Sequence, residues 1–162
     1  MKTIERLHLN SLRVCNLSKL YGLLALCNQK LGNRFNCEQY LNNCKQFLNY
    51  IIEKEKLQND LGIIHDYARC DDDMFLYHFT RALLEMDSGN DSSAFEDFNC
   101  AETHLVRTEG NQFFCYVLFR RNRMECFRNA GKEILYEQEE FILKQYEETH
   151  RCLLYTSDAA DE

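Results

Sequence analysis

The sequence contains no proline and only six glycines among its 162 residues. Proline and glycine punctuate turns, so a chain this poor in them does not have the composition of a turn-rich β fold. Long apolar runs are missing as well. No run approaches the roughly 20 residues that span a bilayer. Residues 1–6 lack the apolar block of a signal peptide. We therefore expect a helical protein without a membrane span or an export signal.

The charge balance is mildly acidic, with 26 Asp and Glu residues against 19 Lys and Arg residues. This balance argues against nucleic acid as the partner, because nucleic-acid binders usually carry a basic face. Nine cysteines are present, but none form a Cys-x-x-Cys pair, and no paired histidines stand at zinc spacing. We expect reduced, cytoplasmic thiols that pack as small apolar side chains, with no metal and no cofactor.

Apolar residues recur along most of the chain at the spacing of amphipathic helices. One such stripe consists of Leu20, Leu23, Leu24, Cys27 and Leu31. The spacing predicts helices near residues 4–31, 36–56, 72–88, 92–107, 112–129 and 132–149, and leaves open a break in the first helix near residues 16–18. Residues 57–70 are the least clear, and no segment alternates strictly as a strand would.

Three glycines each end one helical pattern and precede the next, where a helix C-cap is expected: Gly32, Gly89 and Gly131. The segments that follow the first two, residues 32–44 and 89–101, also resemble each other. Both open with Gly-Asn and then alternate small and large residues. The small residues are Cys37 and Cys44 in one copy and Ala94 and Ala101 in the other, and the large ones are Leu41 and Phe98. Two antiparallel helices need small side chains where they approach most closely, and such hairpins stack to bury their apolar faces.

The chain resembles the tetratricopeptide repeat family at these positions. The first copy fits through Tyr21, Leu24, Ala25, Gly32, Cys37, Leu41 and Cys44, and the second through Ala82, Gly89, Ala94, Phe98 and Ala101. His78 and Arg81 depart from the pattern, because they stand where the family has an aromatic residue and a leucine. The copies lie 57 residues apart rather than the family's typical 34 or so, and the closing proline is absent. The resemblance implies an all-α fold of antiparallel helical hairpins, stacked as a short solenoid over residues 1–150.

The last residues of the chain, 152–162, resemble a translated sequencing-adapter sequence. We therefore expect residues 151–162 to form no domain, to pack poorly and to carry no functional residue. A stack that ends on the helix before this tail would leave an apolar flank uncovered, around Ile134, Phe141, Ile142 and Tyr146.

The resemblance implies a non-enzymatic scaffold that binds a protein or a peptide in a groove lined by the first helix of each hairpin. The groove-facing candidates are Gln29, Lys30, Phe79, Leu83, Met86, Arg120 and Arg123. The two arginines belong to the only concentrated basic patch, residues 120–128. They could hold a carboxylate or a phosphate through bidentate hydrogen bonds, they could contact nucleic acid, or they could simply form a solvated face.

Other functions remain open at this stage. Residues 79–105 are similar to a repeat of bacterial peptide-pheromone receptors, which implies the peptide-sensing domain of a transcriptional or phosphatase regulator. His65 and Asp66 have the order of paired ligands in metal-dependent phosphohydrolases, a chemistry that needs further His and Asp ligands on neighbouring helices. A purely structural bundle is a further alternative, and the oligomeric state is open.

Overall fold

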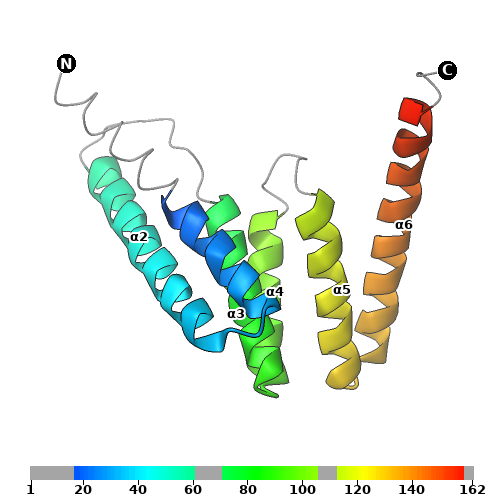
Figure 1. Ribbon diagram of the computed structural model, residues 1–162, viewed down its shortest axis with the longest axis horizontal. Helices are drawn as coiled ribbons and strands as arrows, with labels where there is room; N and C mark the ends of the chain where they lie inside the picture. Colours follow the sequence, from blue (N-terminus) through cyan, green and yellow to red (C-terminus); the bar gives the residue numbers. More distant parts are fainter. Residues whose placement is uncertain (1–16, 61–70, 106–112, 159–162) are drawn as a thin grey trace. The chain divides into compact units, whose positions relative to one another are not determined.

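The structure, a computed structural model, describes residues 17–60, 71–105 and 113–158. Every secondary-structure element in these ranges is an α-helix, which confirms the predicted all-α class (Figure 1). A first helix covers residues 17–30, and five further helices follow: α2 (Arg34–Asp60), α3 (Asp71–Asp87), α4 (Asp91–Leu105), α5 (Phe113–Asn129) and α6 (Glu133–Asp158). None of the helices in the described ranges has the length and apolar character needed to cross a membrane.

Within the described residues, the predicted helix ends agree with the observed ones to within two residues except at two ends. α2 continues to Asp60, past the predicted end at residue 56, and α6 continues to Asp158, past the predicted end at residue 149. The long α2 also helps to explain the spacing between the two sequence copies. It has 27 residues, whereas α4, the corresponding helix of the next hairpin, has 15. Residues 4–16 of the first predicted helix, and the side chains of the tail, lie outside the described residues.

The chain divides into two compact units, residues 1–109 and 110–162. The first unit contains the hairpin of the first helix and α2, followed by the hairpin of α3 and α4. The second unit contains the hairpin of α5 and α6, which pack against each other. The predicted domain of residues 1–150 includes parts of both units, and α6 continues past residue 150.

Each hairpin turns at a glycine in the left-handed backbone conformation, as the sequence predicted. The φ angles are +70° at Gly32, +75° at Gly89 and +66° at Gly131. In the first turn the Asn33 N–H donates to the Asn28 carbonyl at 2.8 Å and the Gly32 N–H donates to the Gln29 carbonyl at 3.0 Å. The other two turns repeat both hydrogen bonds at equivalent residues. This pair of bonds is the Schellman motif, which closes a helix by satisfying its last carbonyl groups.

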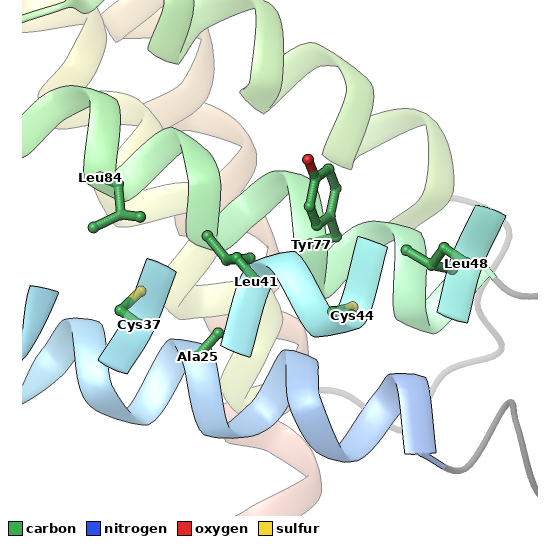
Figure 2. Packing of buried hydrophobic residues seen from close by; sticks show 7 residues of the cluster. All are labelled: Ala25, Cys37, Leu41, Cys44, Leu48, Tyr77 and Leu84. Carbon is green, nitrogen blue, oxygen red and sulfur yellow. The ribbon is translucent and has the colours of Figure 1, made fainter. Parts of the chain in front are cut away.

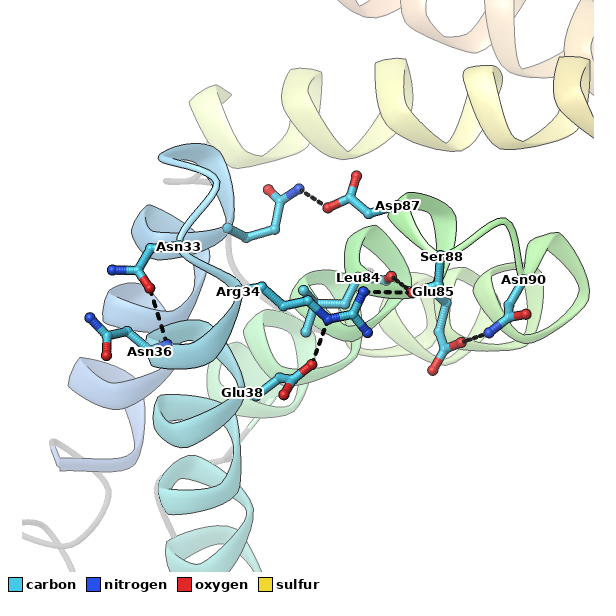
Figure 3. Close-up of polar contacts among 10 residues, drawn as sticks. Asn33, Arg34, Asn36, Glu38, Leu84, Glu85, Asp87, Ser88 and Asn90 are labelled. Atoms are coloured by element: carbon cyan, nitrogen blue, oxygen red, sulfur yellow. Dashed lines mark hydrogen bonds and ion pairs between the residues drawn. The ribbon is translucent and has the colours of Figure 1, made fainter.

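The residue after each glycine also begins the next helix. The Asn33 carbonyl accepts the Cys37 N–H at 3.0 Å, and its side-chain oxygen accepts the Asn36 N–H at 3.3 Å (Figure 3). Asparagine is among the best N-cap residues because its side chain satisfies a free N–H of the first turn. One residue therefore closes a helix and opens the next, so each turn is short and the two helices run antiparallel.

The core of the first unit is built around one face of α2. Figure 2 shows Cys37, Leu41, Cys44 and Leu48 along this helix, between Ala25 of the first helix and two side chains of α3. These are Tyr77 and Leu84, and all seven side chains are buried. The small residues at positions 37 and 44 are where the sequence placed the closest helix approach. Both thiols are enclosed, and burial raises the pKa of Cys37 and of Cys44 to about 11, so they remain protonated.

α3 is buried on most of its circumference, which makes it the central helix of the first unit. Phe79 stacks on Phe75 with ring centroids 5.6 Å apart and lies 6.2 Å from the ring of Phe98 on α4. On another side, Leu76 approaches the first helix at Gly22, where an added Cβ would lie 3.0 Å from the leucine Cβ.

The glycine turns lead to a prediction on stability. A Gly89→Ala variant places a Cβ on a residue with positive φ, which should lower the free energy of unfolding by about 1 kcal/mol. The Cβ itself would meet open space, so the loss comes from the backbone conformation and not from a clash. Urea denaturation measures the effect. A Gly89→Asn variant is the control and should lose less, because asparagine tolerates this conformation better. Equal losses for the two variants would contradict this explanation.

A buried carboxylate lies in the first turn of α3, at Asp73. Its side chain is 4% exposed and its Oδ1 atom has no hydrogen-bond partner. Burial raises the pKa of Asp73 from 3.8 to about 7; the nearby Lys19 acts to lower it and Asp72 to raise it. Between these pH values the unfolded chain has lost this proton while the folded chain keeps it. The free energy of unfolding therefore falls as the pH rises from about 4 to about 7, and the loss is complete above that.

An Asp73→Asn variant should consequently be more stable than the original chain at pH 8 and close to it at pH 4. We expect a gain on the order of 1–3 kcal/mol at pH 8, less than the full pKa shift implies because the helix N-terminus favours negative charge there. Urea denaturation at the two pH values measures the difference. Asp72→Asn is the matched control and should show no gain, since Asp72 forms an ion pair with Lys19 at 2.6 Å. A pH-independent effect of Asp73→Asn would contradict the prediction.

Candidate partner-binding surface

The predicted groove residues of the first hairpin lie at the end of its first helix. Lys30 is exposed, and Gln29 is partly exposed. The Gln29 amide nitrogen donates to a carboxylate oxygen of Asp87 at 3.2 Å, which ties this helix end to the end of α3. A second hydrogen bond links the start of α2 to the residue after α3: the Arg34 guanidinium donates to the Ser88 hydroxyl at 3.0 Å (Figure 3). Gln29 is thus engaged within the chain, and Lys30 is the exposed polar candidate here.

The predicted groove residues of the second hairpin lie mostly in the interior. Phe79 and Leu83 are buried, whereas Met86 is partly exposed. This corrects the expectation that all three line an open groove. The periodicity of α3 indicated an apolar helix, but it did not indicate that neighbouring helices cover nearly every side of it.

The arginines predicted to contact a partner are buried in the third hairpin. Arg120 is 5% exposed and Arg123 is 8% exposed. Both face Glu139 of α6, which is also buried: Arg120 Nη1 lies 2.8 Å from Glu139 Oε1, and Arg123 Nη1 lies 3.6 Å from Glu139 Oε2. The Arg120 guanidinium also lies 5.0 Å from the ring centroid of Tyr116. The structure therefore places these arginines inside their own hairpin and not on the groove side that the sequence suggested.

The second hairpin contains a similar cluster around a buried aspartate. Asp97 of α4 is 1% exposed, and its two carboxylate oxygens bind His78 Nδ1 at 2.9 Å and Arg81 Nε at 2.5 Å. Burial alone would lower the pKa of the Arg81 guanidinium, but its hydrogen bonds to Asp97 and Tyr77 raise that pKa above the ordinary value. His78 and Arg81 are the two residues that departed from the tetratricopeptide pattern, and Asp97 is the partner that accommodates them.

The two clusters occupy the same register. The basic residues stand eleven and eight positions before the turn glycine, and the acidic residue stands eight positions after it, in both hairpins. The first hairpin has Tyr21, Leu24 and Tyr40 at these positions, and the two tyrosine rings stack at 6.2 Å. Aligning the three glycines would have revealed the acidic partners Asp97 and Glu139 from the sequence, but the sequence reasoning missed both.

The largest departure from expectation is the direction of the apolar stripe on the first helix. The residues buried on this helix are Ser18, Gly22, Ala25 and Leu26. The stripe instead forms an outward surface that we call the leucine face: Leu17, Leu20, Leu23, Leu24, Cys27 and Leu31. Leu24 is partly buried and the other five side chains are exposed, up to 81% at Leu31. An apolar helix stripe directed away from the core is a feature of interaction surfaces.

A second apolar surface lies on α6, close to where the sequence predicted an uncovered flank. Ile134 and Phe141 are 72% and 65% exposed, and Ile142 is exposed as well. Together with Glu137 and Gln138 they line a shallow hollow. The fourth predicted residue, Tyr146, is instead partly buried, with its ring centroid 4.1 Å from that of Tyr116.

The proposed phosphohydrolase ligands His65 and Asp66 lie outside the described residues. Within the ranges that the structure describes, no group of three His, Cys, Asp or Glu side chains could hold a metal ion. Two histidines do stack there, His78 and His104, with ring centroids 6.2 Å apart. His78 Nδ1 lies 2.9 Å from a carboxylate oxygen of Asp97. His104 Nδ1 lies 2.8 Å from a carboxylate oxygen of Asp71.

No family model, curated protein or solved structure matches this chain. The likeness to tetratricopeptide repeats therefore rests on the internal repeat and on the three equivalent turns.

The buried cluster around Glu139 gives a further prediction on stability. A Glu139→Gln variant keeps the shape of the side chain but leaves two buried guanidinium groups without the carboxylate they face. We expect the free energy of unfolding to fall by about 2–4 kcal/mol, measured by urea denaturation. The control is Glu140→Gln on the exposed neighbouring residue, which should change it by less than about 0.5 kcal/mol. Equal effects at the two positions would argue against a structural role for the cluster.

Proposed function

We propose that this protein is a non-enzymatic helical scaffold that binds another protein, and that the leucine face is its contact surface. The observation that carries the proposal is the outward direction of this stripe on an ordered helix. Five exposed apolar side chains along one helix and the turn that follows it cost free energy in water, and contact with a partner would recover it.

The organisation of the hairpins supports this proposal. Stacked antiparallel hairpins hold their helices rigidly, which presents a helix face as a preformed surface and lowers the entropic cost of binding. The two arginines that the sequence offered for an acidic partner, Arg120 and Arg123, are buried against Glu139 within their own hairpin. Recognition through the first helix would therefore be apolar, with Lys30 at its edge.

We also propose a cytoplasmic location. The described cysteines that the structure assigns as free thiols are Cys27, Cys37, Cys44, Cys100 and Cys126. A reducing compartment maintains thiols in this state. Cys27 and Cys100 are exposed, so in an oxidising compartment their thiols would be open to oxidation.

Affinity capture from cell extract, followed by mass spectrometry, tests the proposed surface. The bait is the full chain, compared with a Leu20→Lys variant that places a charge on the half-exposed centre of the leucine face. We expect captured partners to be depleted at least tenfold by this variant, because burying an uncompensated lysine is costly. Circular dichroism checks that the variant folds.

The matched control is Ile52→Lys, which adds the same charge at an exposed apolar residue of α2 outside the leucine face. It should capture the same partners as the original chain. Capture that is equal for all three baits would contradict the assignment of this surface.

A further inference from the structure

The side of α6 that faces away from α5 carries the exposed apolar residues of this helix. α5 contacts the opposite side, at Glu139 and Tyr146 (Figure 1). Ile134 and Phe141 stand seven residues apart, which is two helical turns, so they share one face of α6. Both side chains are exposed, at 72% and 65%. Within its own hairpin, this face of α6 is therefore uncovered.

A hollow on this face, which we call the α6 hollow, has apolar ends with a carboxylate between them. It is lined by Ile134, Glu137, Gln138, Phe141 and Ile142, all of which are exposed. Ile134 stands at one end of this stretch, and Phe141 and Ile142 stand at the other, two turns along the helix. An occupant of the hollow therefore needs apolar side chains for both ends and a cation for the carboxylate in the middle.

The glutamates beside the hollow are available to a cation. α6 forms its ion pairs with α5 through Glu139 and Glu147. Within the described part of the chain, Glu133, Glu137 and Glu140 form no ion pair. They follow one another at intervals of four and three residues, which places them along one side of the helix. These three carboxylates form an acidic row, and one of them lines the hollow itself.

The net charge of this face disfavours anionic partners. The exposed charged residues of α6 between residues 133 and 149 are four glutamates and one lysine, Lys144, which give a net charge of −3. The cations near the preceding turn, Arg128 and Lys132, line a different hollow. A face of this sign repels nucleic acid and anionic lipid surfaces and attracts a positively charged segment of another protein.

The spacing of the α6 hollow suits a helix as its occupant. In a helix, residues i and i+7 lie about 10.5 Å apart on one face, and residues i+3 and i+4 lie between them. A helix with apolar residues at the outer two positions and a basic residue at an inner one therefore repeats the order of groups in the hollow. Amphipathic helices that dock on protein surfaces use anchors at this spacing.

We propose that the α6 hollow binds a basic amphipathic helix of another protein. The apolar residues of that helix at i and i+7 contact Ile134 and Phe141, and a lysine or arginine at i+3 or i+4 pairs with Glu137. The leucine face consists of other residues and belongs to the other compact unit. The α6 hollow is thus a second contact surface, which does not depend on the proposed function of the first.

A synthetic amphipathic helix tests the proposal. It carries leucine at i and i+7 and lysine at i+3 and i+4, with a hydrocarbon cross-link on its far face that holds it helical. Fluorescence anisotropy measures its binding to the full chain. We expect saturable binding that weakens as salt is added, because salt screens the charges. A twin peptide with glutamate in place of each lysine keeps the leucines and should bind at least about tenfold more weakly.

Substitutions in the chain locate the binding. Glu137→Lys and Phe141→Ser should each raise the Kd of the lysine peptide at least about tenfold, the first through charge repulsion and the second through loss of an apolar anchor. The matched controls are Glu125→Lys on α5 and Phe35→Ser on α2, which change exposed residues outside the hollow and should leave the Kd unchanged. Circular dichroism checks that each variant folds.

Several results would overturn this site. One is the absence of saturable binding, and another is equal binding of the lysine and glutamate peptides. Losses in the two control variants as large as those in Glu137→Lys and Phe141→Ser would place the binding elsewhere. A loss in Leu20→Lys would assign the peptide to the leucine face. A dimer in sedimentation velocity that Phe141→Ser abolishes would show that a second copy fills the hollow.

The outcomes for the two surfaces can be told apart. If Leu20→Lys leaves extract capture unchanged while Phe141→Ser abolishes peptide binding, the proposed function of the leucine face is wrong and the α6 hollow stands. The reverse pattern removes the α6 hollow and leaves the leucine face.

Discussion

The left-handed glycine at each hairpin turn fixes which residues of the two helices meet. At Gly32, Gly89 and Gly131 the same two hydrogen bonds end one helix, and the next residue begins the following one. Because the connection has the same geometry each time, positions counted from the glycine face each other in the same way in all three hairpins. The small residues Cys37 and Ala94, each five positions after its glycine, are fully buried in consequence. The packing of the hairpins depends on this shared register.

The shared register also explains the buried charges. A side chain eight positions before the glycine approaches one eight positions after it, so a charge at one position requires an opposite charge at the other. Arg81 with Asp97 and Arg123 with Glu139 meet this requirement, while the first hairpin fills the corresponding positions with Leu24 and Tyr40. Buried ion pairs contribute little net stability, because desolvation offsets their attraction. Their value here lies in specifying alignment, since sliding one helix past the other would leave a buried charge without its partner.

Much of the fold followed from the sequence, because helix periodicity and glycine caps are local signals. The helices and all three turns were predictable in this way. The direction of an apolar stripe is not local information. The stripe on the first helix carries the larger side chains, but Ala25 and Gly22 allow closer approach of α2 and α3, and the structure buries that side. Likewise, Arg120 and Arg123 resembled a surface patch until α6 placed Glu139 opposite them. Both differences arise from contacts between segments that a periodicity within one helix cannot show.

Together these two differences move the proposed recognition surface from the buried arginines to the first helix. The two arginines that the sequence offered for binding face inward toward Glu139, whereas the apolar stripe of the first helix faces outward. In the second and third hairpins these inward charges face a buried carboxylate of the same hairpin and so favour one register of its two helices. An outward apolar stripe has no directional bonds to satisfy, so it selects its partner by spacing and shape.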